Sequence, residues 1–103
     1  MDQIIISSHV EFTLKKISKK LYDDEYFAFV EDAENYVQKL RKFFLSIPKQ
    51  KARKTLNKKF GTFYCRYKYN HKTTWYIGFD MEDDIYLIKF VTNNHSADYP
   101  KFV

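Results

Sequence analysis

The chain has 103 residues and a formal net charge of +5, and its composition is 45% hydrophobic and 19% aromatic. This length predicts one domain over residues 1–103, and the aromatic content excludes a disordered chain, because disordered segments lack aromatic residues. No apolar run reaches the roughly 18 residues of a membrane span, and the N-terminus lacks a basic leader, so we expect a cytoplasmic protein with no membrane partner. The single cysteine, Cys65, fits a reducing compartment.

Linear motifs for metals and cofactors are missing from the sequence. There is no Cys/His cluster at zinc spacing, no glycine-rich phosphate loop and no Gly-x-Ser-x-Gly elbow. The sequence therefore predicts neither a cofactor nor a metal site.

The N-terminal quarter of the chain predicts a strand and a helix. Gln3–Ile6 is a short apolar run typical of a strand. Ser8 and Glu11 have the spacing of a capping box, in which the Ser8 hydroxyl accepts from the Glu11 N–H and the Glu11 carboxylate reaches back. We expect a helix from Ser8 to about Leu21.

A second helix should follow after a connection of a few residues. Asp23 and Asp24 are typical helix caps, and Pro48 stops the helix. The short connection predicts an antiparallel helical hairpin. The apolar positions of the second helix recur at helical spacing and are Phe27, Val30, Ala33, Val37, Leu40, Phe44 and Ile47.

The C-terminal half predicts strands joined by tight turns. The basic stretch Lys49–Lys59 has few apolar residues, and we interpret it as a loop or a frayed helix end. Three strands are expected, with a turn at Asn70–Lys72 and an acidic turn at Glu82–Asp84, and their ranges are Phe60–Tyr69, Thr73–Met81 and Ile85–Thr92.

The predicted fold is α+β, in the order β-α-α-β-β-β, with a helical hairpin packed on one face of a small, mainly antiparallel sheet. The strand Ile85–Thr92 is too apolar to be an edge. Alternation along Phe60–Tyr69 places Arg66 and Lys68 on the face opposite Cys65 and Tyr67. We expect that this second face is free for binding.

Basic residues are concentrated in the middle of the chain. Twelve of the eighteen lysines and arginines, and none of the thirteen acidic residues, lie between Asn35 and Phe79. Such a segment is a candidate polyanion-binding surface, although lysines that only keep a small domain soluble give the same count.

Several residues are candidates for binding and chemistry. Arg66 and Lys68 lie two positions apart on one strand face, about 6.6 Å from each other, where an anion can bridge them. His95 just past the last strand can act as a general acid or base, and Tyr99 can donate a proton or stack on a base. Further candidates for RNA binding are Arg53, Lys54, Lys58, Lys59, Tyr64 and His71.

These residue types suffice for cleaving RNA without a metal. The RNA 2′-hydroxyl attacks the adjacent phosphate when one group removes its proton, another protonates the leaving oxygen, and cations hold the extra negative charge. DNA has no such internal nucleophile, so a basic site of this kind favours RNA. We interpret the acidic residues Glu82–Asp84 as a polar turn, not a magnesium site.

The element order and three segments resemble the RelE/ParE superfamily of bacterial toxins. Lys89–Tyr99 is similar to the closing strand and Thr-x-x-His-Ser-x-x-aromatic ending of YafQ-like members. Asp83–Ile88 resembles the last strand of YoeB-like toxins, and Tyr64–Tyr69 resembles the RelE strand whose alternate basic residues contact mRNA.

The resemblance implies a toxin of a type II toxin–antitoxin pair that cuts mRNA on the ribosome, with a small acidic antitoxin as partner. Arg66 and Lys68 take the basic-strand role, His95 the acid/base role and Tyr99 the stacking role. Catalytic members carry an arginine where this chain has Thr73 and Thr74. Two alternatives stay open: a ParE-type toxin that acts on gyrase or another protein, and a plain RNA- or DNA-binding module.

Overall fold

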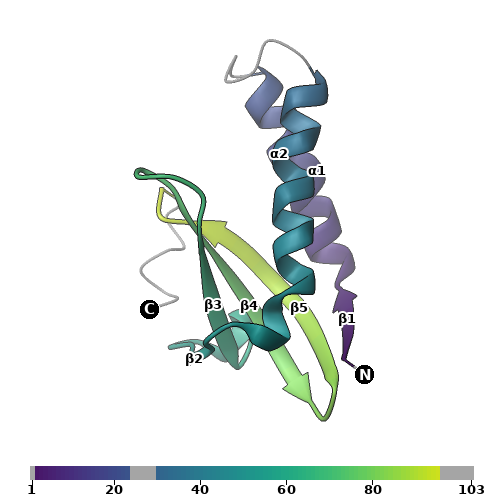
Figure 1. Cartoon of the computed structure of the whole chain (residues 1–103), viewed down its shortest axis with the longest axis vertical. Helices are drawn as coiled ribbons and strands as arrows, with labels where there is room; N and C mark the ends of the chain where they lie inside the picture. The colour runs from purple at the N-terminus through teal and green to yellow at the C-terminus, as the bar shows by residue number, and fades with distance from the viewer. Residues whose placement is uncertain (1, 24–29, 96–103) are drawn as a thin grey trace.

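Two antiparallel helices lie on one face of a five-stranded sheet (Figure 1). The computed structural model describes residues 2–23 and 30–95. The elements in chain order are β1 (Gln3–Ile6), α1 (Ser8–Asp23), α2 (Val30–Leu45), the 3₁₀ turn η1 (Ile47–Lys49), β2 (Arg53–Lys54), the 3₁₀ turn η2 (Lys58–Phe60), β3 (Phe63–Lys68), β4 (Thr74–Glu82) and β5 (Ile85–Asn93).

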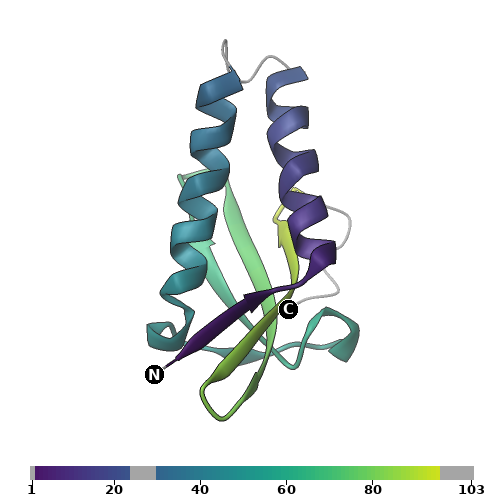
Figure 2. The same cartoon turned by 90° about the vertical axis from the view of Figure 1, so that its right-hand side faces the viewer.

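The strand order across the sheet is β1-β5-β4-β3-β2. β1 pairs in parallel with β5, and all other neighbours are antiparallel. Figure 2 shows β1 running across the base of the two helices, at one edge of the sheet. The predicted α+β class and mainly antiparallel sheet are confirmed, and β5 is an interior strand as its apolar sequence predicts.

The start of α1 differs from the predicted capping box. The Ser7 hydroxyl, one residue earlier, accepts from the Val10 N–H at 3.2 Å and is the cap. The Glu11 carboxylate instead binds Arg41 of α2 through two hydrogen bonds of 2.7 and 2.8 Å. The predicted capping box of Ser8 and Glu11 is therefore wrong, because Ser7 caps the helix and the Glu11 carboxylate binds Arg41 on the neighbouring helix.

The helical hairpin forms where the sequence predicts it, with small shifts at its ends. α1 continues to Asp23, and α2 ends at Leu45 before the η1 turn that contains Pro48. Two of the predictions, Asp24 as a helix cap and Phe27 as an apolar position of the second helix, fall on residues outside the described ranges.

The core lies between the helices and one face of the sheet. Five of the apolar positions predicted for the second helix are buried: Ala33, Val37, Leu40 and Phe44 of α2, and Ile47 of η1. Facing them are alternate residues of β3 and β4, so the face assignment of these two strands is confirmed, whereas a register shift opposite Gly78 and Phe79 interrupts the alternation along β5. The main buried contributors from the sheet are Cys65, Trp75, Ile77, Phe79, Ile88 and Val91.

The basic stretch Lys49–Lys59 is more ordered than the predicted loop. It contains η1, the two-residue strand β2 and η2. β2 pairs antiparallel with β3, with Arg53 opposite Tyr64 and Lys54 opposite Phe63. Because a two-residue strand of basic side chains has no hydrophobic alternation, sequence patterning misses it.

The sheet face opposite the helices, which we call the open face, is only partly free. Phe60 of η2 folds over it and forms a second buried cluster with Tyr64 and Tyr76, against which Phe90 packs. Gly61 permits this close approach, since its φ is +109° and a Cβ there would lie 2.6 Å from the Phe79 nitrogen. The prediction of a wholly free second face is wrong at this position.

Candidate nucleic-acid interface

β3 presents its two cations on the open face. Arg66 and Lys68 are both exposed, and they alternate with Cys65 and Tyr67, which face the helices. Their cross-strand partners on β4 are Tyr76 and Thr74. The predicted placement of Arg66 and Lys68 on one face is therefore confirmed.

β2 adds a third cation to this surface. Residues directly opposite each other in an antiparallel pair share a face, so Arg53 lies on the same face as Tyr64. Arg66 is the next β3 residue on that face, diagonal to Arg53. We call the exposed set Arg53, Arg66 and Lys68 the basic edge. Lys54 is adjacent to Arg53 in β2 and points to the opposite face.

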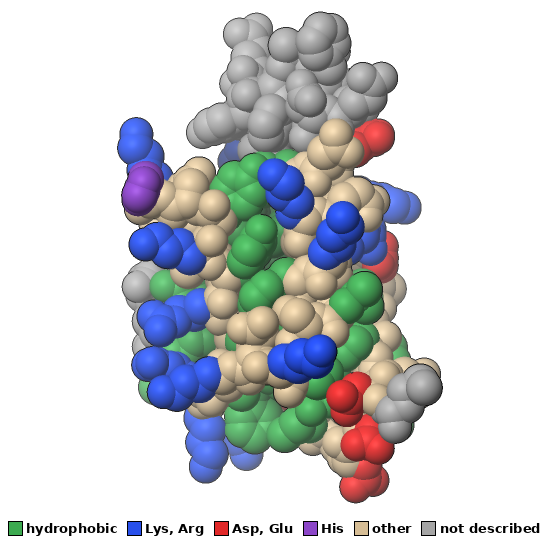
Figure 3. All heavy atoms as spheres, viewed as in Figure 1, with side chains coloured by type: hydrophobic (Ala, Val, Ile, Leu, Met, Phe, Trp, Pro, Cys, Tyr) green, Lys and Arg blue, Asp and Glu red, His purple; other side chains and the backbone are tan. Residues whose placement is uncertain are grey.

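Charge is separated across the molecule. Figure 3 shows lysine and arginine side chains along the side that carries β2, β3 and their turns, with acidic side chains at the opposite lower corner. Between described side chains, the ion pairs are Glu11–Arg41 and Lys89–Asp80, and neither includes the basic edge. The cations of the basic edge are therefore free to meet an external anion.

Asp80, which directly follows the basic middle of the chain, already has hydrogen-bond and charge partners. The Thr62 N–H and hydroxyl donate to Asp80 Oδ1 at 2.8 and 2.9 Å, and Lys89 lies 3.3 Å from its other oxygen. Burial acts to raise the pKa of Asp80, but these hydrogen bonds and the Lys89 charge outweigh it, and the pKa is lowered. Asp80 is thus an ionised structural group.

His95 is held at the end of the sheet by the residue before it. Asn94 Oδ1 accepts from the Thr74 N–H at 3.0 Å, and Asn94 Nδ2 donates to the Lys72 carbonyl at 3.0 Å. The Asn94 N–H also donates to the Thr74 carbonyl at 3.1 Å. These contacts attach the end of β5 to the β3–β4 turn and place His95 Nε2 3.3 Å from the Thr73 hydroxyl.

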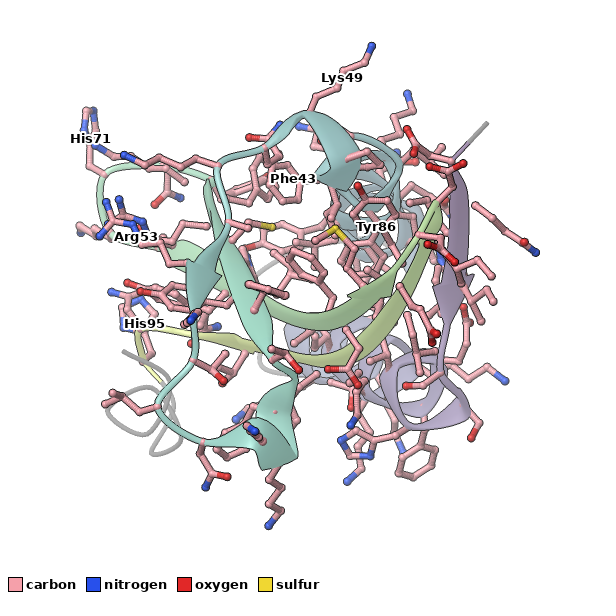
Figure 4. All side chains as sticks on the ribbon, turned by 90° about the horizontal axis from the view of Figure 1, so that it is seen from below. Phe43, Lys49, Arg53, His71, Tyr86 and His95 are labelled. Atoms are coloured by element: carbon pink, nitrogen blue, oxygen red, sulfur yellow. The ribbon has the colours of Figure 1, made fainter. Side chains whose placement is uncertain are left out.

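Of the basic edge, Lys68 lies at the end of the sheet that carries His95, and Arg66 and Arg53 lie progressively further along the sheet. Lys68 pairs with Thr74, and Thr74 bonds to Asn94, so Lys68 and Asn94 are about 10 Å apart across β4 at ordinary strand spacing. Figure 4 shows His71, Arg53 and His95 along one side of the molecule, whereas the half-buried Phe43 and Tyr86 pack against the core.

The remaining predicted site residues have different surroundings. His71 is exposed in the β3–β4 turn, where Asn70 Oδ1 accepts from the N–H groups of Lys72 and Thr73 at 2.8 and 2.9 Å. Lys58 and Lys59 are exposed on η2, above the part of the open face that Phe60 covers.

The prediction that Tyr64 offers an exposed ring for RNA binding is wrong. Tyr64 is 6% exposed within the Phe60 cluster, so it lies beneath the surface that the cations form. Tyr64 therefore offers no exposed ring for stacking next to the open-face cations. Tyr99 lies outside the described residues.

Sequence reasoning missed Asn94 and the pairing of β2 with β3, although Arg53 itself is a predicted RNA-binding candidate. Asn94 carries a side-chain link between two strands, but an asparagine after a strand is typical of any turn. Arg53 is predicted as one basic residue among many, and its pairing opposite Tyr64 has no local signal.

The arrangement is suited to binding a polyanion and transferring protons. Three exposed cations can hold negative charge along the sheet, and Lys68 shares its end of the sheet with His95, whose imidazole is a residue type that serves as a general acid or base. Cys65 does not take part as a nucleophile, since burial raises the pKa of its thiol to about 12.

No protein family, curated protein or solved structure matches this chain. Within residues 2–23 and 30–95, no helix is long and apolar enough to cross a membrane, and no group of three or more metal-ligating side chains is formed.

Proposed function

We propose that this protein is a RelE/ParE-type toxin that binds mRNA on the ribosome and cleaves it without a metal. The observation that carries the proposal is the basic edge of Arg53, Arg66 and Lys68, which is unpaired with any described carboxylate and has Lys68 at the sheet end that carries His95. The exposed positive charges of such a surface attract the negatively charged phosphate backbone of a nucleic acid.

In the proposed reaction, His95 exchanges a proton with the RNA while the cations hold charge. The 2′-oxygen forms a bond to phosphorus, the bond from phosphorus to the 5′-oxygen breaks, and the product is a 2′,3′-cyclic phosphate. The 2′-hydroxyl proton goes to the base, and the leaving 5′-oxygen takes one from an acid. His95 takes the proton of the 2′-hydroxyl, and the Lys68 ammonium, exposed on the open face, gives one to the leaving 5′-oxygen.

The proposed partner is an acidic antitoxin in the same cytoplasm. A partner with negative charge neutralises the basic edge, so the stability of the complex should fall as the salt concentration rises.

A ParE-type toxin that acts on a protein is the second candidate. It is favoured by the Thr73 hydroxyl, which contacts His95 Nε2 at 3.3 Å at the position where the catalytic members that the chain resembles carry an arginine. On this alternative, Arg66 and His95 have no chemical role.

Induction of the protein in growing bacteria, followed by mapping of new mRNA 5′ ends, separates the two. Cleavage predicts growth arrest with new ends inside translated codons, and loss of both with His95→Gln and Arg66→Ala. The matched control Lys20→Gln, on the exposed side of α1, should keep full toxicity. Toxicity that survives His95→Gln and leaves mRNA intact would refute the nuclease and favour a protein target.

A further inference from the structure

A small cavity opens beside β3 where β2 stops. It has a volume of about 130 Å³ and is lined by Gln50, Lys51, Arg53, Tyr64, Cys65 and Arg66. Pockets for whole small-molecule ligands usually measure roughly 300–1,000 Å³, so this cavity fits a single chemical group.

The cavity results from a break in strand pairing. The β2–β3 register places Arg53 opposite Tyr64, and continuing it would place Lys51 opposite Arg66. The described pairing ends at Arg53, because the chain has just left the η1 turn, which ends at Lys49. The edge of β3 at Arg66 therefore has no strand partner among the described residues.

The backbone of Arg66 points a donor into this gap. The Thr55 N–H donates to the carbonyl of Thr62, just before β3, at 3.1 Å, so the backbone of Thr62 points toward β2. The direction of the backbone polar groups alternates along a strand, so those of Tyr64 and Arg66 point the same way. Because β2 does not reach Arg66, its N–H has no backbone acceptor on that side. It makes no other hydrogen bond in the described part of the chain.

The lining is cationic and contains no carboxylate. Lys51, Arg53 and Arg66 are all exposed, and none forms an ion pair with a described residue. Three positive charges around one cavity repel each other at short range, and an anion between them removes that cost. Arginine also matches phosphate geometry through two parallel N–H donors.

We propose that this cavity binds one phosphate group of a single-stranded RNA, held by Arg53, Lys51 and the backbone N–H of Arg66. The choice of RNA as the source of the phosphate rests on the proposed function. The cavity lies on the β2 side of β3, three strand spacings or about 14 Å across the sheet from β5, the strand that leads to His95. It therefore anchors the RNA away from the bond that is cut and makes binding depend on RNA length.

The first test titrates the full chain with inorganic phosphate and follows backbone amide resonances. We expect a saturable shift at the Arg66 amide and none at the Lys20 amide on α1. Arg53→Gln should abolish the shift. A shift of equal size at both amides, or none at Arg66, would overturn the phosphate site.

The second test measures binding of 2′-O-methyl RNA oligonucleotides of increasing length, which cannot be cleaved. Arg53→Gln and Lys51→Gln should each weaken binding of the longer oligonucleotides about tenfold and reduce the slope of log K against log salt by about 0.7. Lys20→Gln removes the same charge outside the cavity and should change neither quantity measurably. Equal losses in all three variants would show that only net charge matters and would refute the site.

These outcomes separate the cavity from the proposed function. A phosphate shift at Arg66 without mRNA cleavage would refute the nuclease and keep the cavity. Cleavage that needs His95 but is insensitive to Arg53→Gln, with no phosphate shift, would refute the cavity alone. Displacement of RNA by polyglutamate with no phosphate shift would overturn the proposal in favour of an acidic peptide at this edge.

Discussion

Removing the Asn94 side chain tests whether the site depends on one side-chain link. Asn94→Ala deletes two hydrogen bonds of 3.0 Å, one from the Thr74 N–H and one to the Lys72 carbonyl. A typical hydrogen bond contributes about 0.5–1.5 kcal/mol net, and both bonds here are exposed to water. We therefore expect a loss of about 1 kcal/mol, which corresponds to a fall in Tm of about 4–8 °C for a domain of this size.

The effect on RNA cleavage should be larger than the effect on folding. Without Asn94, the segment that carries His95 is no longer attached to the β3–β4 turn through side chains, and the contact of His95 with Thr73 is lost. Misplacing a catalytic group by about 1 Å lowers a rate by roughly 10²-fold. We expect a loss of roughly 10- to 100-fold in the rate of cleavage, measured at a temperature where both proteins are folded.

The matched control is Asn94→Asp, which keeps the acceptor for the Thr74 N–H and loses the donor to Lys72. It should retain more activity than Asn94→Ala. The reasoning is refuted if Asn94→Ala lowers the unfolding free energy as expected but cleaves at the original rate, because Asn94 then does not position His95. Unchanged stability would mean that the two hydrogen bonds do not form in solution.

Two further predictions concern the helical layer. Tyr36→Phe leaves the buried Trp75 Nε1–H without its 3.0 Å acceptor, so urea unfolding should show a loss of about 1–3 kcal/mol. Tyr69→Phe removes a hydroxyl from a half-buried ring and should cost less, and equal losses would contradict the role of the bond. The hydrogen bonds and charge of Arg41 lower the pKa of Glu11 below its ordinary value of 4.5, despite the opposing effect of burial. The stability from this pair is therefore complete above that value and is lost as the pH falls through the lower folded pKa. Arg41→Gln should flatten this part of the stability–pH curve in urea unfolding, and an unchanged curve would show that the pair contributes nothing.

Local patterns in the sequence determined the helices, the three long strands and the faces of those strands. The apolar spacing of α2 from Ala33 to Ile47 and the alternation along β3 each depend on neighbours a few residues away, so they can be recognised without the fold. The exposed positions of Arg66 and Lys68 follow from the same alternation.

Tertiary structure alone decided which groups meet. Glu11 was predicted to cap its own helix, but its carboxylate accepts two hydrogen bonds from Arg41 on α2. Phe60 covers part of the open face, and β2 aligns Arg53 with β3, through contacts between segments that pairing brings together. The sequence carries no local signal for these partners, because each contact joins residues that are far apart in the chain and meet only in the folded structure. The attachment of His95 through Asn94 and the gap in pairing at Lys51 are of the same kind.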